Sequence, residues 1–144
     1  MTNATIMPLT PVIGGEIEGI DLATPISDAE ASFIRQALLD HHVVFLRNQA
    51  LDHEQHKAVG NLFGELVKVP FVESVPCHPE IFEIIKLPEE RDVYNFGGNW
   101  HTDMTYMQEP ALVSTLYGAE VPPSGGDTMF ASLEDAYNAL SSGM

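Results

Sequence analysis

The sequence predicts a mixed α+β fold from three patterns. Short stretches that alternate apolar and polar residues are typical of half-buried strands, and a Ser-x-x-Glu capping pattern before apolar residues at helical spacing indicates a helix. A continuous apolar run indicates a strand that is buried on both faces. The 144 residues are 44% hydrophobic, which is enough for one core. Because no repeat or low-complexity linker marks a boundary, we expect residues 1–144 to form a single domain.

The first half is expected to alternate strands with helices. Residues 6–20 alternate apolar and polar positions around glycines, which predicts short strands joined by a tight turn. Ser27 and Glu30 form the capping pattern and predict a helix over about 28–41. The apolar run 43–46 then predicts the buried strand.

The later elements follow the same rules. Asp52 is a suitable N-cap for a second helix that runs to Phe63 and ends at Gly64. Ser132 is expected to cap a short helix over 133–140. Between these helices we expect a strand at 81–85, a polar loop over 88–99, a strand that carries His101, and strands over 111–119 and 127–131.

The composition disfavours several classes of function. A formal net charge of −15 opposes binding to the phosphate backbone of nucleic acid. No apolar run approaches the ~18 residues of a membrane span, and the N-terminus lacks the basic and apolar regions of a signal peptide. The single cysteine, Cys77, excludes an internal disulfide and is typical of the reducing cytoplasm. We therefore expect a cytoplasmic protein that binds neither nucleic acid nor membrane.

Positive charge is confined to the first part of the chain. All 6 lysines and arginines lie in residues 1–91, whereas the ionised side chains of residues 92–144 are carboxylates. These carboxylates form either a solvated acidic surface or a surface that faces a basic segment absent from this chain. The charge distribution by itself does not decide between the two interpretations.

His101 and Asp103 are the residues that point most directly to chemistry. On an extended strand, side chains two positions apart point the same way, about 6–7 Å apart along the backbone. The pair therefore suits two adjacent positions on a metal ion and makes up two thirds of the 2-His-1-carboxylate set of non-haem Fe(II) oxygenases. The alternative is a hydrogen-bonded His–Asp pair in the core, and the pattern leaves both open. No histidine follows Asp103 in this chain.

The other histidines carry a weaker signal. His53 and His56 lie three residues apart on the second predicted helix, a spacing that can bind a metal. Their polar neighbours favour a solvated helix face, and no third ligand lies nearby in the sequence. His41 and His42 close the first predicted helix, where a histidine interacts favourably with the helix dipole.

Two longer motifs and several short segments occur together in a specific order. The motifs are Asn99–Tyr106, which contains His101 and Asp103, and Val121–Thr128, which follows Pro110. The earlier segments are Gly14–Ile17, Asp21–Leu22, His42–Gln49 and Phe63–Leu66. In this order and spacing, essentially the whole chain resembles the TauD/TfdA family of Fe(II)/2-oxoglutarate-dependent dioxygenases.

The resemblance implies a double-stranded β-helix, or jelly roll, with flanking helices. It implies that His101 and Asp103 are the first two iron ligands, and that Thr128 donates its hydroxyl to the distal carboxylate of 2-oxoglutarate. The implied reaction uses Fe(II), 2-oxoglutarate and O₂ to hydroxylate a C–H bond of a small organic substrate. Trp100 is expected to pack beside the site.

Two parts of the family's site have no counterpart here. The second iron-binding histidine and the arginine that binds 2-oxoglutarate lie downstream in the family. The absence of that arginine agrees with the lack of lysine and arginine in 92–144. We therefore expect a truncated chain with an incomplete jelly roll, which holds iron poorly and is inactive alone. Exposed strand edges predict self-association into a homo-oligomer. The alternative is a non-catalytic jelly-roll module that binds a small ligand or a partner chain.

Four positions bear on the substrate. Family members that act on taurine carry a histidine where this chain has Val69 and an asparagine where it has Gly97. A site built to bind a sulfonate loses much affinity without those donors, so taurine is disfavoured. Together with Phe71 and Tyr106, these positions predict a pocket for a larger or more apolar substrate, which can be an anion.

Overall fold

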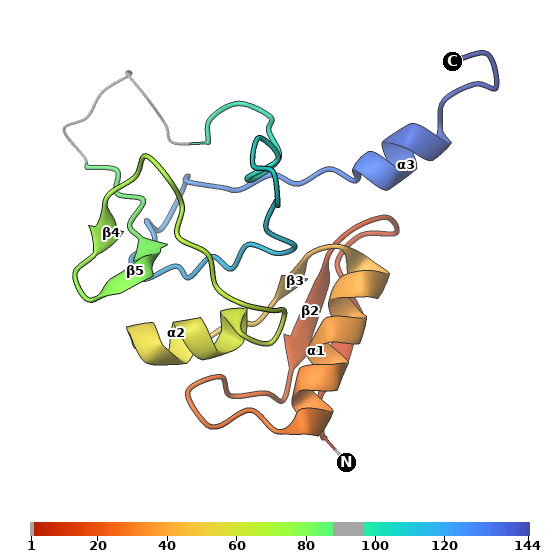
Figure 1. The fold of residues 1–144 in the computed structure, drawn as a ribbon. Helices are drawn as coiled ribbons and strands as arrows, with labels where there is room; N and C mark the ends of the chain where they lie inside the picture. Colours follow the sequence, from red (N-terminus) through yellow and green to blue (C-terminus); the bar gives the residue numbers. More distant parts are fainter. Residues whose placement is uncertain (1, 88–96) are drawn as a thin grey trace. The chain divides into compact units, whose positions relative to one another are not determined.

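The computed structural model describes residues 2–87 and 97–144, which form the mixed α+β arrangement expected from the sequence (Figure 1). Most of the polar loop expected over 88–99 lies outside the described residues. The chain divides into two compact units. The first unit comprises Met1–Asp52 with Tyr117–Met144, and the second comprises His53–Leu116. Each unit contains one small sheet.

A three-stranded sheet forms the centre of the first unit. Its strands are β1 (Thr5–Pro8), β2 (Gly15–Glu18) and β3 (Val44–Phe45). β1 and β2 are antiparallel and β3 lies parallel to β2, so the order across the sheet is β1-β2-β3. The short strands expected within 6–20 and at 43–46 are thus confirmed.

Helix α1 (Asp28–His41) begins and ends with the signals that the sequence carries. The Ser27 hydroxyl accepts a hydrogen bond from the Glu30 backbone N–H at 3.3 Å, and the Glu30 carboxylate accepts one from the Ser27 N–H at 2.9 Å. Hydrogen bonds from Ser27, first from its side chain, lower the pKa of Glu30. At the other end, His42 adopts φ 62° and donates its N–H to the Leu38 carbonyl. The helix expected over 28–41 is confirmed.

The core of the first unit lies between α1 and the sheet (Figure 1). The buried apolar side chains of this unit are Ile17, Ile20, Leu22, Ala31, Ile34 and Ala37. Gly15 on β2 allows the close approach of its neighbours, because a Cβ at this position would lie 2.7 Å from Ile6 Cδ1 and 3.1 Å from His41 Cγ. Local packing at this point therefore requires a glycine.

The second unit packs a short helix against a hairpin. Its elements are α2 (His53–Gly60), β4 (Ser74–Val75) and β5 (His78–Phe82), of which β4 and β5 are antiparallel with an irregular register. α2 contacts β5 and begins directly after Asp52, as expected. The helix ends at Gly60 and not at Phe63, because the next residues form tighter turns of the type Phe63 N–H to Gly60 carbonyl. β5 overlaps the strand expected at 81–85.

The strands expected in the last third are absent from the described residues 97–144. The segments 99–106, 111–119 and 127–131 form turns and irregular backbone instead. A strand persists only where a neighbouring strand completes its hydrogen-bond ladder, and no described strand pairs with these segments. Many of their apolar side chains are exposed, among them Leu112, Leu116 and Met129.

The helix expected over 133–140 is present in a shorter form, α3 (Leu133–Asn138). The Ser132 hydroxyl accepts a hydrogen bond from the Asp135 N–H at 3.0 Å, which confirms Ser132 as its N-cap. α3 buries none of its residues. Within the described ranges, no helix is both long enough and apolar enough to cross a membrane.

Candidate metal centre

His101 lies in irregular backbone and Asp103 begins a turn, so the strand expected around them is wrong. Met104 has a left-handed backbone with φ 57°, and its carbonyl accepts the N–H of Met107 at 3.0 Å. The two predicted ligands nevertheless lie together, since His101 Nε2 is 3.2 Å from Asp103 Oδ1. They meet without a strand around them.

The orientation of the His101 ring is fixed by a backbone group. His101 Nδ1 lies 2.7 Å from the Asn99 carbonyl oxygen. A carbonyl only accepts, so Nδ1 carries the proton and donates it. In the neutral imidazole, Nε2 then presents its lone pair toward the Asp103 carboxylate. Two acceptors at this distance repel each other unless a proton or a cation lies between them. A metal-binding histidine commonly donates its other ring N–H to a backbone carbonyl, as His101 does to Asn99.

The spacing of the two ligand atoms fits adjacent positions on one metal ion. Two atoms bound at a right angle, each about 2.1 Å from the metal, are about 3.0 Å apart, close to the 3.2 Å between His101 Nε2 and Asp103 Oδ1. Both side chains are half exposed, which leaves room for further ligands. In the described part of the chain, no group of three or more His, Cys, Asp or Glu side chains is arranged to hold a metal. The residues present therefore fit two positions of a metal site.

Met104 holds this turn in the second unit, a role that the sequence interpretation missed. It is 8% exposed and is the one buried side chain among the described residues of that unit. Its sulfur accepts a hydrogen bond from the Tyr106 hydroxyl at 3.6 Å. The hydroxyl oxygens of Thr102 and Thr105 lie 2.9 Å apart across the turn. An apolar residue directly after Asp103 was the available signal.

The four residues predicted to bear on the substrate all belong to the second unit. Gly97 lies against the site, because a Cβ on it would be 3.2 Å from His101 Cε1. Tyr106 belongs to the same turn and is 65% exposed. Val69 is half-buried, while Phe71 is 98% exposed, and both lie on the loop between α2 and β4.

Thr128, the predicted contact to 2-oxoglutarate, lies in the first unit. Its side chain is exposed, and it follows Gly125 and Gly126, whose φ angles are 79° and 74°. Only glycine adopts such angles without strain, so the turn expected before Thr128 is supported by the backbone. Trp100, expected to pack beside the site, is 68% exposed.

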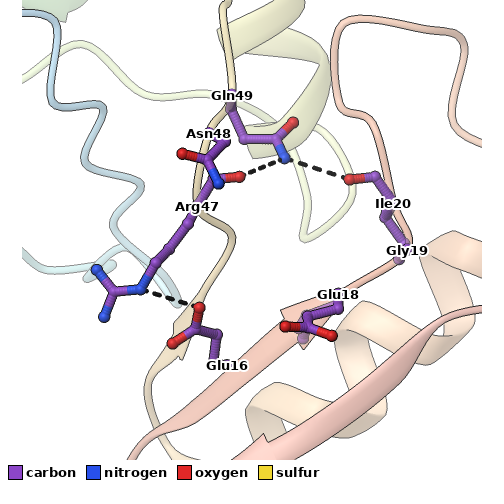
Figure 2. A pocket seen from close by; sticks show the side chains of 8 residues that line it. Glu16, Glu18, Gly19, Ile20, Arg47, Asn48 and Gln49 are labelled. Carbon is purple, nitrogen blue, oxygen red and sulfur yellow. Dashed lines mark hydrogen bonds and ion pairs between the residues drawn. The ribbon is translucent and has the colours of Figure 1, made fainter.

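A polar pocket of about 260 Å³ lies in the first unit, beside the ends of β2 and β3 (Figure 2). Arg47 Nε donates to Glu16 Oε1 at 2.9 Å. The Gln49 side-chain amide donates to the carbonyls of Ile20 and Arg47, and its oxygen accepts the N–H of Leu22. These polar groups already bind one another, and their hydrogen bonds join the segments that follow β2 and β3.

The expectation of a solvated helix face holds for His53, which is exposed, but not for His56. The His53 ring lies 4.7 Å from the His78 ring, measured between centroids. His56 is half-buried, and its Nε2 lies 3.1 Å from the Thr115 hydroxyl.

Known proteins resemble this chain along almost its full length. The sequence profile described as "Taurine catabolism dioxygenase TauD, TfdA family" matches residues 5–144. Over 134 residues the chain is 39% identical to an alkylsulfatase of Acinetobacter baylyi, an alignment that covers 92% of this chain and 40% of that protein. Over 147 residues it is 32% identical to an alpha-ketoglutarate-dependent 2,4-dichlorophenoxyacetate dioxygenase of Cupriavidus pinatubonensis, with 92% and 51% covered.

One solved structure supports the same relationship. The crystal structure of a taurine dioxygenase from Burkholderia xenovorans matches 74% of this chain with a TM-score of 0.61 and 37% sequence identity, and the match covers 37% of that chain. This chain thus spans about half, or less, of the length of the proteins that it resembles.

Proposed function

Since the chain belongs to the TauD/TfdA family of dioxygenases, we propose that it supplies part of the active site of an Fe(II)- and 2-oxoglutarate-dependent dioxygenase. The observation that carries this proposal is the 3.2 Å approach of His101 Nε2 to Asp103 Oδ1, with the Nε2 lone pair freed by the hydrogen bond to Asn99. This arrangement prepares two adjacent ligand positions before any metal binds.

Each residue of the proposed site has a defined role. His101 and Asp103 hold the iron, the Asn99 carbonyl sets the imidazole orientation, and buried Met104 anchors the turn. Thr128 donates its hydroxyl to the distal carboxylate of 2-oxoglutarate. When bound, Fe(II) with 2-oxoglutarate and O₂ supplies the oxidation of a substrate C–H bond.

The missing half of the site comes from sequence that this chain does not contain. Its alignments cover 40% and 51% of two relatives, so those proteins have ample further length for a second histidine and for an arginine that binds 2-oxoglutarate. The acidic residues of 92–144 suit a cationic neighbour. In this proposal the chain is a truncated form, folded as an incomplete jelly roll in the cytoplasm, and inactive alone.

The substrate is proposed to be a small organic anion other than taurine. The names of the two relatives refer to an alkylsulfatase and to a dioxygenase of 2,4-dichlorophenoxyacetate, so both concern molecules that combine an anionic group with an apolar part. At Val69 and Gly97 this chain lacks the histidine and the asparagine of the family members that act on taurine. Phe71 and Tyr106 add apolar surface. A chain in which Val69 and Gly97 line the site is expected to prefer an apolar sulfate ester or aryloxyalkanoate.

Self-association is part of the same proposal. Apolar side chains in the described residues 97–144 are exposed, several by more than 60%, and such surfaces favour contact with another copy of the chain. Light scattering on the isolated chain is expected to show a homo-oligomer. A monomer at all concentrations tested would remove this part of the proposal.

A second candidate is a non-catalytic jelly-roll module that binds a small ligand. The observation in its favour is that the described residues supply two metal ligands and no third. Small ligand binding that persists after removal of metal, and that is unaffected by His101→Ala, would favour this candidate.

The test of the proposed incompleteness uses the chain as it stands. With two protein ligands, anaerobic addition of Fe(II) and 2-oxoglutarate is expected to give no strong charge-transfer absorption and no succinate once O₂ is admitted. Tight stoichiometric binding of both by the monomer would show that the site is complete in this chain.

A further inference from the structure

Three histidines of the second unit meet outside the candidate metal centre. His53 and His56 lie on α2 and His78 begins β5; we refer to them as the histidine cluster. The rings of His53 and His78 have centroids 4.7 Å apart at an interplanar angle of 50°. His56 Nε2 lies 3.1 Å from the Thr115 hydroxyl. The cluster thus connects α2 both with the hairpin and with the segment that contains Thr115.

Among the described residues, the ion pairs at the cluster can balance only one added proton. Glu54 Oε1 lies 3.4 Å from His78 Nδ1 and 3.0 Å from Lys57 Nζ, and Glu80 Oε2 lies 3.9 Å from the same Nζ. The hydrogen bond to Glu54 is the main cause that raises the pKa of Lys57. Two carboxylates and one ammonium leave a single net negative charge. A second imidazolium therefore creates an excess of positive charge.

Protonation of the cluster acts against the packing of α2. A proton on His78 faces the Glu54 carboxylate, but a further proton on His53 places two cationic rings in contact. For His56, burial is the main cause that lowers the pKa, and the nearby His53 also lowers it, whereas the hydrogen bond with Thr115 raises it. The native arrangement therefore favours neutral His56.

Helix α2 is held in place without a buried side chain of its own. None of the residues of α2 is buried, so its contact with β5 lacks an apolar core. The polar contacts of the histidine cluster and the Lys57–Glu80 ion pair join side chains of α2 to the rest of its unit. A change of charge in the cluster then has a direct structural effect.

We propose that the histidine cluster is an acid-sensitive contact, which holds α2 against the β4–β5 hairpin at neutral pH and releases it in mild acid. The sign follows from proton binding. Release exposes the half-buried His56 to water, where it binds a proton more readily than in the packed state, so release becomes more favourable as the pH falls below the ordinary histidine value of 6.5.

Amide hydrogen exchange at pH 7.5 and pH 5.5 tests this proposal in the full chain. After correction for the intrinsic rates, the protection of α2 amides is expected to fall about tenfold at the lower pH. The amides of α1, in the first unit, serve as an internal reference and are expected to change less than about twofold. Equal protection of α2 at the two pH values would overturn the proposal.

Two variants separate titration from structure. Replacing both His53 and His56 by glutamine keeps polar side chains that do not titrate, so the difference in α2 protection between the two pH values should disappear. His42→Gln, at the end of α1, is the matched control and should retain the full pH response. A response that survives the double replacement would contradict the proposal.

If the double variant loses helix α2 altogether, a single replacement still tests the proposal. His53→Gln retains the contact between His56 and Thr115 and removes the pair of adjacent rings. The proposal requires a smaller pH response than that of the parent chain. An unchanged response in His53→Gln would contradict it.

Discussion

Residues 5–45 and residues 97–144 are both rich in apolar side chains, but only the first region buries them well. In the first region, α1 covers the sheet and shields residues such as Ile17 and Ile34. In the second region Met104 is the one buried residue, while Leu112 is 85% and Leu116 is 72% exposed. The difference arises because β2 has a partner strand on each side and a helix above it. Apolar residues form a core only when such partners are present.

Substitutions at Ile34 and Leu112 should show this difference most strongly. Ile34 is 2% exposed, so Ile34→Ala is expected to lower the free energy of unfolding of the first unit by about 2–5 kcal/mol. The matched change Leu112→Ala removes an exposed side chain and should alter stability by no more than about 0.5 kcal/mol. Denaturant titration followed by circular dichroism measures both. Equal effects would mean that Leu112 is buried in solution.

A methyl group at Gly15 should have the next largest effect. Gly15→Ala places a Cβ about 2.7 Å from Ile6 Cδ1, and such overpacking costs about 1–3 kcal/mol. Gly143→Ala, which meets no atom within 4 Å, is the control in the second region. The same titration applies, and a neutral Gly15→Ala would show that the Ile6 side chain moves aside without cost.

The N-caps of α1 and α3 offer a comparison with a smaller expected effect on stability. Ser27→Ala removes the cap of α1 and should cost about 1 kcal/mol. Ser132→Ala removes the same kind of cap from α3, which buries nothing, so global stability should be unchanged. A loss of global stability on Ser132→Ala would indicate that α3 packs against a partner in solution.

The capping box also predicts a dependence on pH. The pKa of Glu30 is lowered by Ser27, so its contribution to stability is present above the ordinary value of 4.5 and is lost as the pH falls through the folded value. Stability measured from pH 7 to pH 3 should therefore decline less in Ser27→Ala than in the parent chain. Parallel curves would contradict this linkage.

Local signals explain which parts of the fold could be predicted from the sequence. Ser27 and Glu30 define the start of α1 by hydrogen bonds within four residues, and Ser132 does the same for α3. The strands expected at 111–119 and 127–131 depend on distant partners, which a pattern of apolar residues does not reveal. Their prediction therefore failed while the helices were confirmed.

The candidate site was predicted in its residues but not in its geometry. The spacing of His101 and Asp103 suggested one shared point on a strand, yet in the structure the two side chains meet in irregular backbone that leads into a turn with a positive φ at Met104. Methionine carries no preference for that conformation, so the turn could not be predicted from the residue type. The Asn99 carbonyl that orients His101 is a backbone group and leaves no trace in the sequence.

Metal affinity is the most direct test of the central claim, that His101 and Asp103 together bind a divalent ion. Anaerobic titration of the chain with Co(II), followed by absorption, is expected to show weak binding that falls at least about tenfold in His101→Ala and in Asp103→Asn. His42→Ala, at the end of α1, is expected to bind as the parent does. Binding that is equal in the parent, His101→Ala and Asp103→Asn would contradict the claim.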